Sequence, residues 1–347
     1  MSRKLAVVAL VATILAVPVH SMSLPNGTRV ERYKGGLNFP VDMAWVKGTK
    51  KVFFTEKDSG KIRVMLGRRV LKRACVKLDV NSSGERGLLG ITLHPKFKRN
   101  HQLYVFYTNA VPLDNRVTRF TVRNNRCTAP RNIMTGVNAS SSGYHNGGQL
   151  EFAGGKLFVS TGEAHDPGLA QDRGNRLGKI LRYNPNGSIP KGNPGTGNPV
   201  WSFGHRNPFG LAHKPGSSKL YSTENGPGCD DELNKIERGR NYGWGDNYRC
   251  GTAGVGPNPK APLRRWSDVI VPTDATWYRG RMKSLSGSLY VGSFYDGLHR
   301  IVLNKAGNRL RADRKIHNAS DITDVSKGPG GWLYFLTTGG MFRIVPR

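Results

Sequence analysis

After its first 21 residues the sequence has no apolar run long enough to cross a membrane as a helix. It contains no CxxC pair, so its four cysteines argue for disulfides rather than for a metal cluster. It has no helical heptads, which excludes a coiled coil. It also lacks a basic helix and an RNA-binding motif interleaved with aromatic residues, so no common nucleic-acid module is present.

Glycine and proline are abundant, with 44 and 20 residues in a chain of 347. Both residues interrupt regular structure and mark turns, and so many turns favour an all-β architecture. The hydrophobic content of 37% is low but sufficient for a core. By length alone, the chain could form one large domain or two ordinary ones.

The N-terminus has the pattern of a secretory signal peptide. Arg3 and Lys4 form a charged start, residues 5–19 are apolar, and small residues suited to cleavage end at Ser21. We therefore predict that residues 1–21 are removed and that the mature chain, residues 22–347, is secreted without a stable membrane span. An uncleaved anchor is the alternative, although the apolar run is short for one.

The cysteines fit secretion, because an even number in a secreted chain indicates disulfides. Three pairings are open from the sequence alone. We expect Cys229–Cys250, which would close a local loop, and Cys75–Cys127. Five N-x-S/T sequons mark loops that would carry glycans in a host that glycosylates secreted proteins. They begin at Asn26, Asn81, Asn138, Asn186 and Asn318.

The net charge is strongly positive, with 53 Lys and Arg against 23 Asp and Glu, or +30. Removal of residues 1–21 takes away Arg3 and Lys4 and leaves +28. Such a charge favours a polyanionic partner, such as nucleic acid, an acidic glycan or an anionic membrane surface. Because the charges are scattered along the chain, a generally basic surface without a specific partner is the alternative.

One two-strand phrase recurs along the chain: a short strand rich in Leu, Tyr, Phe and Val, a turn, and a second strand. Examples are "KKVFFTEKDSGKIRVM" and "GSLYVGSFYDGLHRIVL". The copies begin near residues 50, 101, 155, 218, 287 and 331. Six copies at this spacing predict a six-bladed β-propeller formed as a single domain by residues 22–347. The early segment "TRVERYKGG" is expected to pair with the last blade and close the ring, and a β-sandwich is the alternative.

Four loops carry residues suited to chemistry. They are "SSGERGLLGITLHPKF" with Glu85, "GYHNGGQLEF" with His145, "GHRNPFG" with Arg206 and Asn207, and "TENGPGCDDELNKIERGRNYGWG". An imidazole can take a proton near neutral pH, a guanidinium can hold an anionic oxygen, and turn carbonyls with carboxylates suit calcium. Each loop alone is more often structural, but in a propeller loops from several blades meet on one face.

Together these segments resemble the soluble quinoprotein sugar dehydrogenases, the glucose/sorbosone or aldose sugar dehydrogenase family. The motifs that carry the resemblance are "GERGLLGITLHPKF", "HNGG", "LGKILRYNPNGSIP", "GHRNPFGLA" and "GPGCDDELNKIERGRNYGW", in this order. The similarity extends from about Gly35 to Pro346. It implies a six-bladed propeller that uses pyrroloquinoline quinone (PQQ) and calcium.

The resemblance also implies roles for individual residues. His145 would be the general base, and Glu163 stands where the family usually has an Asp that orients this His. Arg206 and Asn207 look like the residues that contact PQQ, with Arg206 also stabilising negative charge on the quinone oxygen.

Further roles concern the metal and the substrate. Gly226 and Pro227 would offer carbonyl oxygens to the calcium beneath PQQ. Glu232 and Tyr242 look like residues near a second, structural calcium, and Glu85 stands on the substrate side.

The chain departs from the family where cations usually meet the PQQ carboxylates. Tyr295 stands at or near the position of a Lys, and Asp321 and Thr323 replace two Arg. Each lost charge-assisted contact is worth about 1.5–3 kcal/mol, so loss of two or three predicts PQQ binding weakened by roughly 10²–10⁶-fold.

Two functions therefore remain open. The first is a secreted dehydrogenase that oxidises the anomeric hydroxyl of an aldose sugar with hydride transfer to calcium-bound PQQ and passes electrons to an external acceptor. The second is a catalytically impaired, basic propeller that binds a polyanion, nucleic acid or acidic glycan, or acts as a packaging module. The surviving His145, Arg206, Asn207 and Gly226 favour the first, and the lost cations with the +28 charge favour the second.

Overall fold

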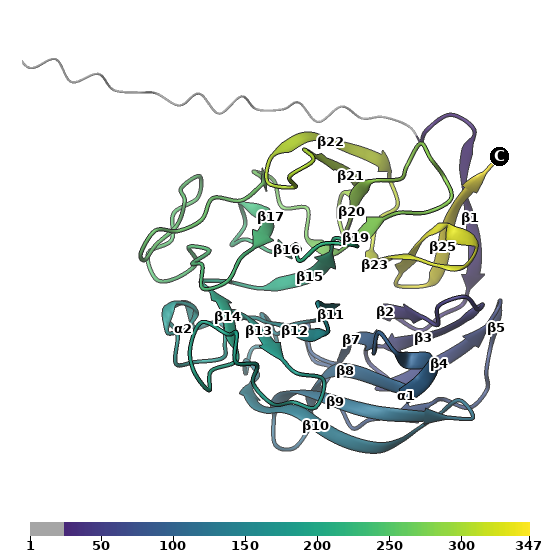
Figure 1. The fold of residues 1–347 in the computed structure, drawn as a ribbon, viewed down its shortest axis with the longest axis horizontal. Helices are drawn as coiled ribbons and strands as arrows, with labels where there is room; N and C mark the ends of the chain where they lie inside the picture. The colour runs from purple at the N-terminus through teal and green to yellow at the C-terminus, as the bar shows by residue number, and fades with distance from the viewer. Residues whose placement is uncertain (1–23) are drawn as a thin grey trace, which may run out of the picture.

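Six small antiparallel sheets surround a common axis, with one strand of each sheet facing the centre (Figure 1). This computed structural model describes residues 24–347. The predicted signal peptide, residues 1–21, and the first two residues of the predicted domain lie outside the described residues. The prediction of a six-bladed β-propeller is confirmed, and the β-sandwich alternative is wrong.

We number the blades by their order along the chain. Blade 1 contains β2 (Pro40–Trp45), β3 (Lys51–Glu56), β4 (Lys61–Leu66), β5 (Arg69–Val70) and β6 (Val76–Lys77). Blade 2 contains β7 (Leu88–Leu93), β8 (Gln102–Asn109), β9 (Asp114–Arg123) and β10 (Arg126–Asn138). Blade 3 contains β11 (Gly147–Ala153), β12 (Lys156–Thr161), β13 (Lys179–Tyr183) and β14 (Val200–Phe203).

The remaining blades follow the same plan. Blade 4 contains β15 (Pro208–His213), β16 (Leu220–Glu224), β17 (Asp231–Ile236) and β18 (Arg264–Trp266). Blade 5 contains β19 (Pro272–Tyr278), β20 (Ser288–Ser293), β21 (Gly297–Leu303) and β22 (Leu310–His317). Blade 6 contains β23 (Ile322–Lys327), β24 (Leu333–Thr337), β25 (Gly340–Pro346) and β1 (Thr28–Gly35).

Helices are few and short in the described chain: α1 (Phe97–Asn100), α2 (Pro167–Gln171) and the 3-10 turn η1 (Pro329–Gly331). Across residues 24–347, none has the length and apolar character needed to span a bilayer.

The ring closes through the first strand of the chain. β1 pairs antiparallel with β25, from Thr28 opposite Pro346 to Gly35 opposite Gly340, so that the two ends of the described chain form one sheet (Figure 1). This is the closure expected for "TRVERYKGG". The pairing covers the outer edge of blade 6, which would otherwise expose unpaired backbone groups.

The six repeated phrases form the second and third strands of the six blades. Their apolar residues are buried on both faces, because each blade packs between two others. In β3, for example, Val52, Phe53 and Phe54 are fully buried in succession, with Phe53 packed toward blade 2 and its neighbours toward blade 6. A strand in this position therefore needs consecutive apolar residues, whereas a strand with one face in solvent would alternate apolar and polar residues.

Two disulfides fix the outer parts of the ring, with the pairing that we predicted. Cys75–Cys127 joins the edge of blade 1 to β10 of blade 2, with the Cα atoms 5.0 Å apart. Cys229–Cys250 closes the loop around the start of β17, with a Cα separation of 6.2 Å. The first disulfide links residues 52 positions apart and so restrains two neighbouring blades.

Three inner strands are joined to the next inner strand by an aspartate. Each is the third residue of its strand, and its carboxylate accepts a hydrogen bond from a backbone N–H of the neighbouring blade. The bonds run from Ile91 N to Asp42 Oδ2 (2.7 Å), from Met43 N to Asp324 Oδ2 (3.0 Å) and from Val325 N to Asp274 Oδ2 (3.2 Å). These carboxyls connect the inner strands of blades 5, 6, 1 and 2 in sequence.

The three aspartates line an axial cavity of ≈ 240 Å³ together with Glu151 and Gln149. Burial, followed by repulsion between the carboxyls, raises the pKa of Asp42 well above its usual value. The same causes raise the pKa of Asp324, which also hydrogen-bonds Asp274, and burial raises the pKa of Asp274 to about 6. No Lys or Arg of the described chain forms an ion pair with these carboxyls. Burial and mutual repulsion therefore favour the protonated form of these carboxyls.

We predict that Asp324→Asn stabilises the protein more at about pH 8 than at about pH 5. Asn keeps an oxygen for Met43 N and an N–H for Asp274, but it cannot ionise. Because the folded pKa of Asp324 lies above the unfolded value, the wild-type protein loses stability as pH rises from about 4, by ~1.4 kcal/mol per pH unit, until the folded pKa is reached. Thermal unfolding at the two pH values measures the difference.

The control is Asp324→Ala, which leaves Met43 N without an acceptor and should cost about 1–3 kcal/mol at both pH values. An Asn variant with the same effect on stability at both pH values would show that Asp324 is already ionised in the folded protein.

Candidate active site

The meander of each blade brings particular connections to one face of the ring. The inner strand runs away from this face and the second strand returns to it. Segments just before an inner strand and just after a second strand therefore lie on the same face. Residues predicted for the site before inner strands are Glu85, His145, Arg206, Asn207 and Asp321. Those after second strands are Glu163, Gly226, Pro227 and Tyr295.

His145 and Glu163 form a buried pair between two loops of blade 3. His145 Nδ1 lies 2.6 Å from Glu163 Oε1, and the His145 side chain is 11% exposed. Glu163 is itself held in place, because its other oxygen accepts a hydrogen bond from Asp166 N at 2.9 Å. With Nδ1 directed at a carboxylate, Nε2 is the ring atom left to take up a proton.

The two loops approach closely at the backbone. His145 has a φ of 57°, an uncommon left-handed conformation for a residue with a side chain. A Cβ on Gly162 would lie 2.1 Å from His145 O, so only glycine fits at this position. The "HNGG" and "STGE" segments therefore pack backbone against backbone, which requires glycine at position 162.

Glu85 holds the site loops of three blades together. Its Oε2 accepts hydrogen bonds from His145 N at 2.8 Å and from Asn207 Nδ2 at 3.0 Å. Asn207 in turn accepts a hydrogen bond from Gly147 N at 3.1 Å, and it is 1% exposed. Glu85 and Asn207 therefore position the site loops in this structure. The substrate role of Glu85 and the cofactor role of Asn207 stay predictions.

Arg206 lies half-buried near the His145–Glu163 pair. Its Nη1 donates to Asn225 O at 2.9 Å, and its guanidinium lies 5.2 Å from the Trp244 ring centroid. Its buried Nε has no hydrogen-bond partner. Burial lowers the pKa of Arg206, although carboxylates around it, led by Glu163, act in the opposite direction.

A second buried His–Glu pair supports the "GHRNPFG" loop from below. Glu224 Oε1 accepts from Asn207 N at 2.9 Å and from Arg206 N, and its Oε2 lies 2.8 Å from His205 Nδ1. His205 is fully buried, and its Nε2 lies 2.8 Å from Ser202 Oγ. The sequence reasoning missed Glu224 and His205, which fix the loop that carries Arg206.

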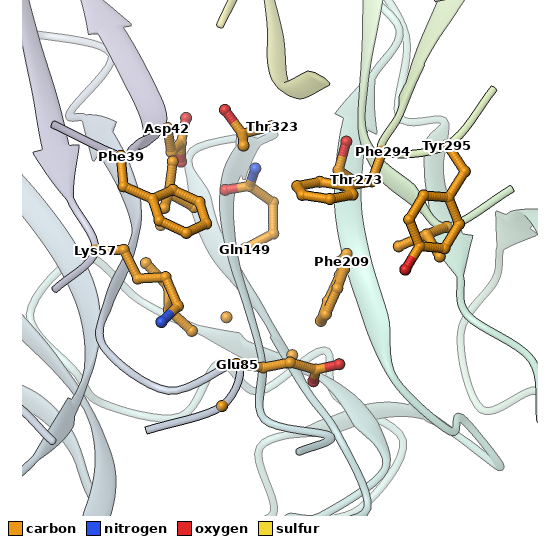
Figure 2. Close-up of a pocket in the computed structure, with 17 residues that line it drawn as sticks. Phe39, Asp42, Lys57, Glu85, Gln149, Phe209, Thr273, Phe294, Tyr295 and Thr323 are labelled. Atoms are coloured by element: carbon orange, nitrogen blue, oxygen red, sulfur yellow. The ribbon is translucent and has the colours of Figure 1, made fainter. Parts of the chain in front are cut away.

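A cavity of ≈ 290 Å³ opens at this face along the axis. Figure 2 shows aromatic rings of Phe39, Phe209, Phe294 and Tyr295 around it, with Lys57 and Glu85 at one end of the view. Lys57 was not predicted. Its Nζ donates to Asp58 Oδ1 and Ser82 O, both at 2.9 Å.

The position of Lys57 follows from the blade repeat. Thr55-Glu56-Lys57, Thr161-Gly162-Glu163 and Thr223-Glu224-Asn225 all end the second strand of their blades and enter the same face. An alignment of these three phrases would have placed Lys57 beside the site, in the position that Glu163 and Asn225 occupy in other blades.

The three residues that stand at the family's cation positions do not all lie at the cavity. Tyr295 and Thr323 line the cavity, whereas Asp321 is engaged elsewhere through a hydrogen bond from Thr338 N at 2.9 Å. Thr323 Oγ1 already donates to Pro40 O at 2.8 Å, so its hydroxyl hydrogen is occupied. Tyr295 is 68% exposed, and no hydrogen bond from its hydroxyl is seen in the described structure.

The predicted calcium residues fall into two groups. Gly226 and Pro227 lie on the site face, and within residues 24–347 neither carbonyl oxygen accepts a hydrogen bond. Glu232 and Tyr242 are buried and engaged by protein: Asn234 Nδ2 donates to Glu232 Oε2 at 3.0 Å, and the Tyr242 hydroxyl donates to Lys235 O at 2.5 Å. Burial raises the pKa of Glu232 to about 8.

One compact group of metal-ligating side chains occurs in the described chain, and it is Cys229, Asp230 and Cys250. Its two sulfurs form a disulfide and are not available as thiolate ligands. The second calcium site near Glu232 and Tyr242 stays a prediction.

Comparison with known proteins identifies the family. The glucose/sorbosone dehydrogenase family profile matches residues 37–345. The chain belongs to the glucose/sorbosone dehydrogenase family. This membership confirms the predicted resemblance and the prediction that the chain is an enzyme, an oxidoreductase acting on CH–OH groups.

Individual relatives in this family are similar over most of their length. An aldose sugar dehydrogenase of Escherichia coli is 30% identical over 296 residues, which is 78% of this chain and 80% of that protein. An uncharacterized Synechocystis protein is 30% identical over 350 residues, 89% of this chain and 84% of that protein. The PQQ-bound aldose sugar dehydrogenase of Streptomyces coelicolor matches with a TM-score of 0.80 and 28% identity, covering 95% of this chain and 99% of that one.

We predict that Glu85→Ala destabilises this family member by about 2–4 kcal/mol, because His145 N and Asn207 Nδ2 both lose their acceptor. Chemical denaturation measures the free energy of unfolding. Glu85→Gln, which keeps one acceptor oxygen, should lose less. Asp79→Ala, at an exposed position, serves as the matched control and should change stability by less than about 0.5 kcal/mol. Equal stability of the two Ala variants would contradict a role of Glu85 in joining the loops.

Proposed function

We propose that this protein is a PQQ- and calcium-dependent aldose sugar dehydrogenase that oxidises the anomeric hydroxyl of a sugar to a lactone. The observation that carries the proposal is the His145–Glu163 pair at 2.6 Å. It lies near Arg206 and is joined to the axial cavity by Glu85, which lines the cavity and accepts a hydrogen bond from His145 N. The family membership supports the reaction class, and the PQQ-bound relative supports the cofactor.

Each residue of the candidate site would have one role in the reaction. His145 Nε2 accepts the proton of the anomeric hydroxyl, and the Glu163 carboxylate stabilises the imidazolium that results. Arg206 supplies a positive charge close to this pair. Bound PQQ, polarised by calcium, would accept the hydride that leaves the anomeric carbon, and an external acceptor would later remove the two electrons.

The cavity fits a flat, aromatic, anionic cofactor in part. Aromatic side chains line it. Outside its lining, on the same face, the buried Arg206 Nε and Asn225 Oδ1 are polar atoms without partners in the described protein. Lys57 would hold a PQQ carboxylate, because two protein oxygens leave one of its three N–H groups available. Tyr295 would add a phenolic donor, whereas Asp321 and Thr323 would add none.

Calcium would bind at the loop after β16. The free carbonyl oxygens of Gly226 and Pro227 are the hard ligands that calcium takes in proteins. Asp231 shapes this loop, since its Oδ1 accepts a hydrogen bond from Gly226 N at 2.8 Å. The Cys229–Cys250 disulfide restrains the same loop.

We also propose that the protein works outside the cytoplasm. The signal-like N-terminus and the two disulfides support an oxidising compartment. Of the five sequons, Asn26, Asn138, Asn186 and Asn318 are exposed and could accept glycans.

We predict that the purified protein with PQQ and calcium reduces an artificial dye in the presence of an aldose, and that His145→Ala lowers kcat by about 10²–10⁴-fold. PQQ should still bind to the variant, because His145 acts on the substrate proton. Dye reduction measures turnover, and PQQ absorbance after gel filtration measures binding.

His213→Ala is the control, since His213 lies at the end of β15 and bonds Ser217 O away from His145. Absence of sugar-dependent reduction in the wild-type protein, with no PQQ retained, would reject the proposed function. Normal turnover of His145→Ala would reject the assignment of the base.

We further predict that Lys57→Ala weakens PQQ binding by roughly 10–100-fold, the loss of one charge-assisted contact. Lys57→Arg should bind PQQ within about threefold of the wild-type protein. Fluorescence quenching on titration with PQQ measures the dissociation constant. Lys61→Ala, a partly exposed cation on β4, is the control. Unchanged PQQ affinity in Lys57→Ala would show that another group holds the carboxylate.

A further inference from the structure

The positive charge is concentrated in two neighbouring blades. Residues 36–138, which form blades 1 and 2, contain 20 Lys and Arg and six Asp and Glu. They therefore carry +14, half of the +28 of residues 22–347, in fewer than a third of those residues. Asp42, Glu56 and Asp114 are buried, and Glu85 belongs to the candidate site, so Asp58 and Asp79 are the exposed acids.

Five of these cations lie where the outer edges of the two blades meet, and we call them the basic rim. Its members are Lys72, Arg73, Lys77, Arg123 and Arg126. The first three flank Cys75 and the last two precede Cys127, and these cysteines form the disulfide between the blades. Backbone bonding adds to the link, because Cys127 N donates to Cys75 O at 3.0 Å and the Arg126 guanidinium donates to Ala74 O.

The strand registers place like charges opposite each other in this region. Arg123 pairs with Arg126 in β9 and β10, and Lys61 pairs with Lys77 in β4 and β6. Directly opposed like charges destabilise a sheet. In the described structure none of the five rim cations forms an ion pair with a carboxylate that would offset this cost. The Cys75–Cys127 disulfide joins the two segments that carry Lys77 and Arg126.

We propose that the basic rim binds a linear acidic polysaccharide. Four of its five cations are exposed, and they lie on segments of two blades that the Cys75–Cys127 disulfide joins. Carboxylates spaced along a flexible chain can each meet a guanidinium or an ammonium group, and the disulfide reduces the freedom that the protein loses on binding. This function is separate from the proposed oxidation, because the candidate site lies at the axis.

Two features favour a polysaccharide over nucleic acid. Single-stranded nucleic acid gains much of its binding from stacking on aromatic rings, and the large apolar side chains exposed on the described surface do not lie at the rim. They are Val111, Leu113, Tyr144, Val269 and Tyr295. A duplex would place one convex surface against another, since β10, which carries Arg126, lies on the outside of the ring (Figure 1). A flexible glycan chain can follow that curvature.

Polygalacturonate fragments are the probe for the full-length protein, with neutral dextran for comparison. The variant carries Lys72→Glu, Arg73→Glu and Arg123→Glu, and the matched control carries Arg309→Glu, Arg311→Glu and Arg314→Glu on the exposed edge of blade 5. Both lose the same net charge. We expect the rim variant to bind polygalacturonate at least tenfold more weakly at about 50 mM NaCl, and its affinity to depend less on salt up to about 200 mM, whereas the control changes by less than threefold.

Each of the following outcomes would overturn the proposal. Equal losses in both variants would show attraction by net charge alone. No binding of polygalacturonate by the wild-type protein, or equal binding of dextran, would reject an acidic polysaccharide as the ligand. Tighter, rim-dependent binding of oligothymidylate or duplex DNA would assign the surface to nucleic acid. Circular dichroism verifies folding, and the uncharged variant Lys72→Gln, Arg73→Gln, Arg123→Gln replaces the first variant if charge reversal disturbs it.

Discussion

Crowding at the axis is the constraint on which the rest of this structure depends. Six inner strands meet there, and their third residues are Asp42, Gly90, Gln149, Gly210, Asp274 and Asp324. A Cβ on Gly90 would lie 2.2 Å from Gly148 O, and one on Gly210 would lie 2.8 Å from Asp274 Cα, so these positions admit no side chain. The acids at other positions bond the amides of the next strand, and Gln149 Nε2 donates to Asp274 Oδ1 at 3.0 Å. The relative placement of the inner strands sets the placement of the loops before them, including those of Glu85, His145 and Arg206.

Much of this architecture could be predicted because it repeats. The six strand phrases predicted the blade count, and the early segment predicted the closing strand. The sequence left three disulfide pairings open, and the structure confirms the one that we expected. The loops with His145, Glu163, Arg206 and Gly226 could be assigned to one face, since a meander alternates the direction of its strands. The aspartates at the axis occupy the third position of three inner strands. They were missed because Gly or Gln holds this position in the other three inner strands, so the six strands share no residue type there.

The hydrogen-bond partners of individual side chains could not be predicted from their positions in the sequence. Placement against the family pattern put Asp321 and Thr323 where arginines usually stand, but their partners, Thr338 and Pro40, come from distant parts of the chain. Asn207 was expected to contact the cofactor, and the structure shows both ends of its amide used between blades. Lys57 was missed because its own segment does not distinguish it from a surface Lys, and only comparison with the strand ends of other blades places it on the site face. What sets it apart is the tertiary neighbourhood of Phe39 and the axial cavity, which local sequence does not specify.

The radial layout also separates charge. Acids gather inside, where burial raises the pKa of Asp42, Asp324 and Glu151 well above the usual range, and cations gather on the outside of blades 1 and 2. A carboxyl that keeps its proton contributes no negative charge. Each of these carboxyls therefore opposes the positive charge of the outer surface less than an exposed Asp or Glu would. Folding thus places the acids that join the inner strands away from the exposed cations of blades 1 and 2, and this separation leaves that outer surface basic and attractive to anions.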